Sequence, residues 1–149
     1  MKTGKAKFVF LADDDIDDRL LFEDALSEVS TDTELKVVAD GIELMNMLYE
    51  TCPPPPDVIF LDLNMPRKNG FECLDELKLN NKYKDIPIVV FSTSCEKEFI
   101  NKVYEKGADH YLCKPGSFPA LKAAISKVLD IDWTEQQKSP SRENFLITF

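Results

Sequence analysis

Short runs of apolar residues alternate along the chain with longer segments whose apolar residues recur every three or four positions. Each run is short enough and apolar enough to be a strand buried on both faces. These predicted strands cover residues 8–12, 35–39, 58–61, 88–91 and 111–113. The periodic segments between them indicate amphipathic helices. These predicted helices cover residues 16–29, 41–50, 71–79, 96–106 and 118–129.

Alternating strands and helices of this kind predict an α/β fold with a parallel sheet covered by helices on both faces. Because crossovers between parallel strands are right-handed, we expect the sheet to be doubly wound. In such a sheet, ligands bind beyond the carboxyl ends of the strands. The residues that follow each strand are therefore the first candidates for a functional site.

Carboxylates follow two of the predicted strands directly. Asp13 and Asp14 come after the first strand, and Asp62 comes after the third. If those strands are neighbours the carboxylates converge, and two carboxylates about 5 Å apart repel by about 3 kcal/mol at an effective dielectric of 20. A hard divalent cation removes that repulsion, and Mg²⁺ suits a few carboxylates together with a phosphate oxygen. The sequence therefore predicts a Mg²⁺ pocket at these three residues.

The neighbouring acids Asp15, Asp17 and Asp18 stand where a helix begins, so we expect them to cap that helix or to be solvated. A calcium-binding EF-hand loop starting at Asp13 does not fit the pattern. Such a loop needs glycine where Asp18 stands and glutamate at position 24, which is an aspartate.

Two further strand ends add a hydroxyl group and a positive charge. Ser92 follows the fourth strand and Lys114 follows the fifth. Either residue alone is more often an ordinary surface or turn residue, so only their joint placement with Asp62 points to a function. A carboxylate between a metal ion and an ammonium group is arranged for phosphoryl transfer, because both cations neutralise the equatorial oxygens during attack.

Length and charge narrow the classes of function. The 149 residues fit one domain, and the net charge of −9 argues against binding to nucleic acid or to an anionic membrane surface. Only five apolar residues follow the basic N-terminal segment, which is too few for a signal peptide or a membrane span.

The cysteine pattern indicates neither a metal site nor a redox motif. The four cysteines, at positions 52, 73, 95 and 113, form no CxxC pair, and the lone His110 offers no partner for zinc. We therefore expect reduced, structural thiols and a cytoplasmic location.

Four segments together resemble the receiver domain of bacterial two-component response regulators, the CheY-like superfamily. They are the acid pair after residues 8–12, the block Asp57–Gly70 around Asp62, the segment Ile86–Ser94, and the segment Gly107–Pro115. The combination is specific and covers about residues 7–130. The resemblance implies a flavodoxin-like fold with five parallel strands in the order 2-1-3-4-5.

The resemblance also implies roles for individual residues. Asp62 would be the phosphorylation site, with Lys114 paired to the acyl phosphate. Mg²⁺ would be bound directly by Asp14 and Asp62, mainly through water by Asp13, and by the backbone carbonyl of Asn64.

The same resemblance implies a conformational switch beside the phosphorylation site. Ser92 would be the switch hydroxyl and Tyr111 the aromatic switch residue. The Lys114–Pro115 bond would be cis. Ser92 stands where the family more often has threonine, Thr93 stands where it usually has a smaller residue, and Phe118 follows the loop after Pro115. These departures leave the dephosphorylation rate open but do not affect the assignment of the site.

The narrower resemblance is to stand-alone regulators of the phytochrome-associated type. It implies a single-domain response regulator that takes a phosphoryl group from a sensor histidine kinase or a phosphotransfer protein. Such a protein is a phosphoacceptor and not a turnover enzyme. Its output would pass to an unknown downstream protein through a partner-binding face.

The last residues allow more than one interpretation. We expect residues 1–130 to form the receiver domain and residues 131–149 to form a C-terminal tail. Within that tail, 133–142 is polar and indicates a tether, whereas Asn144–Phe149 is apolar and β-prone. This apolar end could dock on its own domain, join a second copy in a homodimer, or fray.

The face formed by the predicted helix 96–106, the predicted strand 111–113 and the predicted helix 118–129 offers three candidates for exposed contact residues. They are Phe99, Tyr104 and Tyr111, although core packing is favoured for Phe99.

Other functions are weaker on the sequence. A phosphatase with an aspartyl nucleophile wants a second aspartate two residues after Asp62, where Asn64 stands. A flavin module would need a phosphate-binding loop after the first strand, where aspartates instead repel phosphate. A receiver that only binds partners is disfavoured because the acids, Ser92 and Lys114 are all present.

Overall fold

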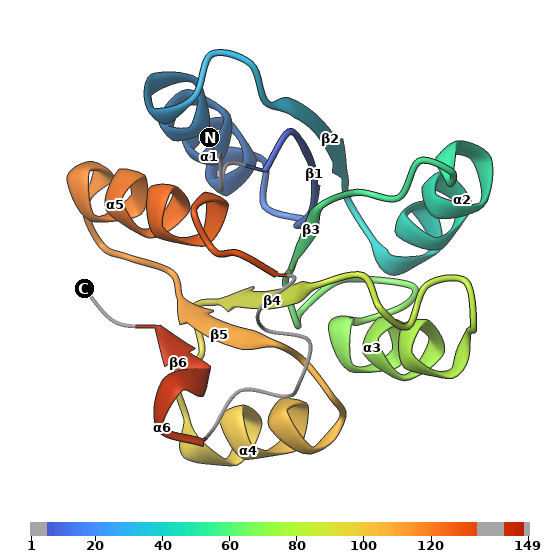
Figure 1. Cartoon of the computed structure of the whole chain (residues 1–149). Helices are drawn as coiled ribbons and strands as arrows, with labels where there is room; N and C mark the ends of the chain where they lie inside the picture. Colours follow the sequence, from blue (N-terminus) through green and yellow to red (C-terminus); the bar gives the residue numbers. More distant parts are fainter. Residues whose placement is uncertain (1–5, 134–141, 148–149) are drawn as a thin grey trace.

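The computed structural model describes residues 6–133 and 142–147. Strands and helices alternate in it from the N-terminus (Figure 1). They are β1 (Phe8–Ala12), α1 (Ile16–Val29), β2 (Glu34–Val38), α2 (Gly41–Thr51), β3 (Val58–Leu61), α3 (Gly70–Leu79), β4 (Ile88–Ser92), α4 (Lys97–Glu105), β5 (His110–Cys113), α5 (Phe118–Leu129), α6 (Arg142–Phe145) and β6 (Leu146–Ile147). Every predicted strand and helix is present, with ends that differ from the prediction by one residue at most.

The strands form one parallel sheet in the order β2-β1-β3-β4-β5-β6. The first five positions confirm the predicted doubly wound, flavodoxin-like order. The sixth strand was not predicted as part of the sheet and extends it at the β5 edge. Ala12 on β1 lies opposite Leu61 on β3, so the residues that follow these two strands emerge side by side.

Helices cover both faces of the sheet (Figure 1). On one face, Phe10 and Ile59 pack against apolar side chains of α2, α3 and α4. On the other face, Val9 and Phe60 pack against α1 and α5. Because alternate strand residues face opposite layers, the strands need apolar side chains at every position, which is the pattern seen in the sequence. No helix in the described ranges is long and apolar enough to cross a membrane.

A capping side chain and a glycine define the ends of two helices. The Asp15 carboxylate accepts hydrogen bonds from the backbone N–H groups of Asp17 and Asp18, at 2.9 and 3.2 Å, so the prediction that Asp15 caps a helix is confirmed. At the other end of the sheet, Gly107 follows α4 with φ of +99°, a left-handed conformation that suits glycine.

Two predictions are wrong, namely the cis peptide bond at Lys114–Pro115 and the reduced state of all four cysteines. The cis peptide bonds of the described residues are Cys52–Pro53 and Pro53–Pro54, so Lys114–Pro115 is trans. Trans is the form that an X–Pro bond favours by about 0.5–1 kcal/mol when its surroundings do not select the other.

Cys95 and Cys113 are not free thiols but form a disulfide bond, with Cα atoms 5.8 Å apart. Ser92 lies opposite Cys113 in the β4–β5 register, so the chain that leaves β4 passes close to Cys113. Sequence spacing does not show that proximity. The other two cysteines, Cys52 and Cys73, are free.

The C-terminal segment 142–147 lies beside β5 and α4 (Figure 1). Leu146 pairs with Tyr111 in the sheet. The Phe145 ring is fully buried and packs edge-on against Tyr104, with ring centroids 5.0 Å apart. His110 Nδ1 lies 3.1 Å from the Asn144 carbonyl oxygen. The described part of the predicted apolar end therefore docks on its own domain.

The structure corrects the expectation that Tyr111 is exposed, and the predicted tether lies mostly outside the described residues. Tyr111 is fully buried and not an exposed contact residue, and the Phe145 ring packs against it. Phe99 and Tyr104 are partly buried and pack against the core. Most of the predicted tether and the last two residues lie outside the described ranges.

Candidate functional site

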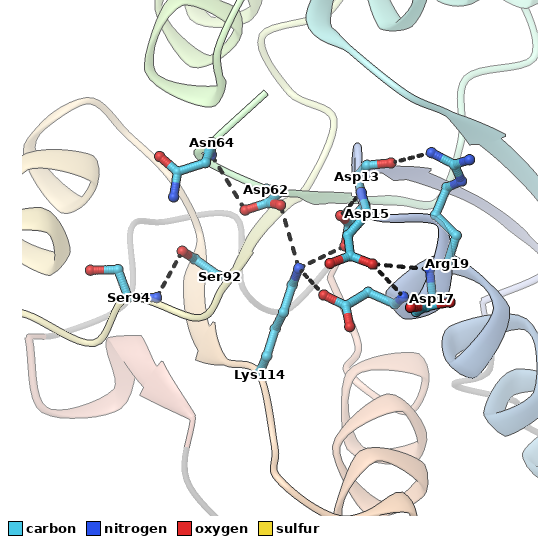
Figure 2. A network of polar contacts seen from close by, with 10 residues as sticks. Asp13, Asp15, Asp17, Arg19, Asp62, Asn64, Ser92, Ser94 and Lys114 are labelled. Carbon is cyan, nitrogen blue, oxygen red and sulfur yellow. Dashed lines mark hydrogen bonds and ion pairs between the residues drawn. The ribbon is translucent and has the colours of Figure 1, made fainter. Parts of the chain in front are cut away.

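The three predicted carboxylates converge at the carboxyl ends of β1 and β3. Asp13, Asp14 and Asp62 each offer one oxygen, and these oxygens lie within 4.8 Å of one another. The convergence follows from the sheet order, which makes β1 and β3 neighbours. Figure 2 shows Asp13 and Asp62 with the Lys114 ammonium group between them.

The donor atoms fit a hard divalent cation. Asp13 is fully buried, and its Oδ2 atom accepts no hydrogen bond from the described residues. Its backbone is held in place because Arg19 Nη1 donates to the Asp13 carbonyl oxygen at 2.9 Å. A buried carboxylate oxygen without a hydrogen-bond donor is costly unless a cation is near. An all-oxygen set of this kind suits Mg²⁺ and related hard ions.

Lys114 follows β5 and brings its ammonium group into the acidic cluster. Its Nζ atom lies 2.8 Å from Asp13 Oδ2, in an ion pair without hydrogen-bond geometry, and 3.4 Å from Asp62 Oδ2. It also donates a hydrogen bond of 2.8 Å to Asp18 Oδ2. The expectation that Asp18 is a capping or solvated residue is therefore wrong. Residues 18 and 114 are 96 positions apart, so only the fold brings them together.

The surroundings raise the pKa values of both Asp62 and Lys114. This disfavours the charged form of Asp62 and favours the charged form of Lys114. Burial raises the pKa of Asp62 to about 6; the charge of Lys114 opposes this rise and that of Asp13 adds to it. Burial lowers the pKa of Lys114, but its contacts with Asp13 and Asp18 outweigh that effect and raise it above the usual range. Lys114 is therefore charged at neutral pH.

The two predicted switch residues lie on the β4 and β5 side of Asp62. Ser92 is fully buried, and its Oγ atom accepts a hydrogen bond from the Ser94 N–H group at 3.1 Å (Figure 2). The Tyr111 hydroxyl donates to the Ser94 carbonyl oxygen at 2.5 Å. Burial raises the pKa of Tyr111. The segment after β4 thus joins the hydroxyl near Asp62 to the aromatic residue on β5.

The loop after Asp62 is fixed by residues that sequence reasoning missed. Asp40, the buried N-cap residue of α2, accepts a hydrogen bond from Arg67 Nε at 2.9 Å and forms an ion pair with Arg67 Nη2 at 2.8 Å. Arg67 itself has φ of +66°, in the left-handed region. The Asn64 N–H group donates to Asp62 Oδ1 at 3.4 Å. A turn signal at residues 40–41 was visible in the sequence, but its partner 27 positions away was not.

Gly70 allows α3 to begin directly against the strand that carries Asp62. A Cβ atom on Gly70 would meet the Asp62 carbonyl oxygen and would lie 2.8 Å from the Leu63 Cα atom. Both are backbone atoms, so no side-chain rotation could relieve the clash. The glycine is therefore needed for space beside the candidate phosphoacceptor.

The sequence has relatives among known proteins. The chain matches the sequence model of the response regulator receiver domain over residues 9–126. The chain belongs to the response regulator receiver domain family. Members of this family are phosphoacceptor switches in phosphorelay signalling.

Individual relatives narrow the likeness to phytochrome response regulators. The chain is 37% identical to the response regulator Rcp1 of Synechocystis sp. over 145 residues, which cover 94% of this receiver and 97% of Rcp1. The match spans smaller parts of some longer relatives, 48% of one and 12% of another.

Two solved structures show the same likeness in three dimensions. The phosphorylated cyanobacterial phytochrome response regulator RcpA has a TM-score of 0.78 and 32% identity, covering 91% of this receiver and 99% of RcpA. The Mn²⁺-bound form of Rcp1 has a TM-score of 0.74 and 33% identity, with the same coverage of both chains.

Proposed function

We propose that this receiver is a single-domain response regulator of a two-component phosphorelay. Asp62 accepts a phosphoryl group from a sensor histidine kinase or a phosphotransfer protein. The observation that carries this proposal is the position of the Asp62 carboxylate, 3.4 Å from the Lys114 ammonium group and within a cluster of three converging aspartates. The match to relatives named as response regulators over nearly their whole length supports the same function.

The proposed transfer needs an ionised carboxylate. A pKa of about 6 leaves Asp62 mostly ionised at neutral pH. One Asp62 oxygen attacks the phosphorus atom of a phosphohistidine, so a P–O bond forms and the P–N bond breaks. The imidazole nitrogen leaves with the electron pair and is protonated from solvent. Lys114 pairs with the oxygens of the transferred group, which carry the developing charge.

Mg²⁺ is the cofactor that we propose for this site. Asp14 and Asp62 would bind it directly, Asp13 mainly through water, and the backbone carbonyl of Asn64 would complete the protein ligands. When bound, the ion supplies further charge neutralisation on the phosphoryl oxygens. The convergence of three aspartate oxygens within 4.8 Å of one another supports this assignment. The Mn²⁺-bound structure of Rcp1 supports a divalent ion in general.

Phosphorylation would act as a switch and not as a step of metabolic turnover. Ser92 would move toward the phosphoryl group and Tyr111 would report that movement on β5. The output surface would be the face of α4, β5 and α5, which would bind an unknown downstream protein in the cytoplasm. Residues 131–149 would act as a tail that docks on this face or takes part in a homodimer.

The alternatives are a phosphatase with an aspartyl nucleophile and a receiver that only binds partners. The first lacks an acid at Asn64, whose backbone N–H group donates to Asp62. The second leaves unexplained why Lys114 is held so close to Asp62.

A pull-down with and without a small phosphodonor and Mg²⁺ tests the proposal. Wild type should gain acid-labile phosphate and capture a partner that Asp62→Asn does not. If wild type gains no phosphate, or Asp62→Asn gains it equally, the proposed function fails. Rapid release of inorganic phosphate with many turnovers would instead favour the phosphatase.

A further inference from the structure

Among the residues that the structure describes, Asp18 is the one carboxylate that contacts Lys114 and stands outside the group of three metal-ligand candidates. It lies in the first turn of α1, and its side chain is 30% exposed while that of Lys114 is 10% exposed. The contact of 2.8 Å from Lys114 Nζ to Asp18 is a hydrogen bond, and it is shorter than the 3.4 Å bond to Asp62. The pair is therefore a well-formed, partly buried ion pair and not a surface contact.

The lysine shares its other contacts with the candidate metal ligands. Asp13 and Asp62 both lie within ion-pair distance of Lys114, and both belong to the converging oxygens. A divalent cation held by those oxygens would weaken their attraction for Lys114 and would also repel its ammonium group. Asp18 keeps its full charge in that situation, so it is the contact that can hold the lysine in the pocket.

The N-terminal cap of α1 holds the backbone of Asp18 in place. The Asp15 side chain caps α1 by accepting from the Asp18 N–H group at 3.2 Å, which sets the position of the first turn. An ammonium group has three donor hydrogens. One bond to Asp18 leaves two hydrogens for Asp62 and for a phosphoryl oxygen.

We propose that Asp18 is a positioning residue that keeps the Lys114 ammonium group beside Asp62 when a metal ion occupies the aspartate cluster. This inference rests on the proposed function of Asp62 as phosphoacceptor. Asp18 does not contact the phosphoryl group in this account; it acts only through Lys114. Loss of Asp18 should therefore have the same consequence as partial loss of Lys114.

The chain offers a matched control one residue earlier. Asp17 lies in the same first turn, carries the same charge and is exposed. Asp17→Asn and Asp18→Asn change the net charge and the charge at the helix N-terminus equally. A difference between the two variants therefore reports the contact with Lys114.

The test uses the full chain as wild type, Asp17→Asn, Asp18→Asn, Lys114→Met and the double variant Asp18→Asn/Lys114→Met. The first measurement is the initial rate of phosphorylation by acetyl phosphate at saturating Mg²⁺. The second is the NMR signal of the lysine ammonium groups at saturating Mg²⁺, because a held ammonium group exchanges slowly with water.

Asp18→Asn should slow phosphorylation about tenfold, the size expected when one charge-assisted hydrogen bond is lost, and should abolish the slowly exchanging Lys114 signal. Asp17→Asn should stay within about twofold of wild type, since exposed charges contribute little. In the Lys114→Met background, Asp18→Asn should slow the reaction no further.

Equal rates for Asp17→Asn and Asp18→Asn, or a tenfold effect that persists without Lys114, would overturn the inference. If wild type accepts no phosphate, the proposed function fails separately, and the ammonium signal alone decides: its loss in Asp18→Asn supports the positioning role and its retention overturns it.

Discussion

The ring of Phe145 packs against the ring of Tyr111, with centroids 6.5 Å apart, and both side chains are fully buried. The contact joins the C-terminal segment to the strand that carries the proposed aromatic switch. The Tyr111 hydroxyl donates to the Ser94 carbonyl oxygen within the protein. The C-terminal segment is thus in direct contact with the region that phosphorylation is proposed to rearrange.

Phe145→Ala should release this segment. Removing a buried ring costs about 3 kcal/mol or more when the cavity persists. Here the segment can detach instead, so we expect the free energy of unfolding to fall by about 3 kcal/mol or less. Urea denaturation measures the loss, and limited proteolysis detects the released segment. Leu146→Ala is the control, because Leu146 is 36% exposed and its loss should change stability little. Equal, small effects of both variants would contradict docking through Phe145.

Deleting residues 143–149 tests the same segment by the mass of the protein in solution. If the segment docks only on its own domain, the mass per particle should be that of the shortened monomer and stability should fall. A dimer that becomes a monomer on deletion would show that the segment exchanges between copies. Unchanged association state and unchanged stability together would contradict docking of either kind.

Gly70→Ala should destabilise the protein and disturb Asp62. The added methyl group would meet backbone atoms of Asp62 and Leu63, which cannot move aside without shifting β3. Overpacking of this kind costs about 1–3 kcal/mol, and the rate of phosphorylation should fall with it. Gly116→Ala is the matched control, because a Cβ atom there meets nothing within 4 Å. Thermal unfolding of both variants checks the prediction, and equal melting temperatures would contradict it.

The raised pKa of Asp62 predicts how stability depends on pH in metal-free protein. The folded value is about 6, whereas an unfolded aspartate has a pKa of about 3.9. Because the folded state binds this proton more tightly, the contribution is fully present below about pH 3.9. It is lost as pH rises to about 6, by up to about 3 kcal/mol.

Asp62→Asn cannot ionise and should escape that loss. Its unfolding free energy relative to wild type should therefore increase by up to about 3 kcal/mol between pH 4 and pH 7, measured by urea denaturation with a chelator present. The difference between the two proteins removes the contributions of other titrating groups. A difference that is the same at both pH values would contradict the pKa assigned to Asp62.

The strands and helices were predictable because each strand packs against helices on both faces of the sheet and is therefore apolar along its whole length. Asp13, Asp14, Asp62, Ser92 and Lys114 could be placed at one edge because they follow strands. Parallel strands end at the same edge, so residues distant in sequence were expected to meet there.

What the sequence could not predict depends on contacts between segments far apart. The bond between Asp18 and Lys114 spans 96 positions, and Asp18 has the same residue type and helical context as its exposed neighbour Asp17. Pairing of Cys95 with Cys113 needs the β4–β5 register, which spacing does not give. The contact of Tyr111 with Phe145 depends on the C-terminal segment, whose docking the sequence left open.

Asp62 as the phosphoacceptor is the central claim, and mapping the modified residue tests it most directly. Wild-type protein is phosphorylated with acetyl phosphate and Mg²⁺, then treated with borohydride, which reduces an aspartyl phosphate to homoserine. Mass spectrometry of the peptides locates the change. We predict homoserine at position 62 and at no other aspartate. Homoserine at another position, or none in protein shown to bind Mg²⁺, would contradict the account.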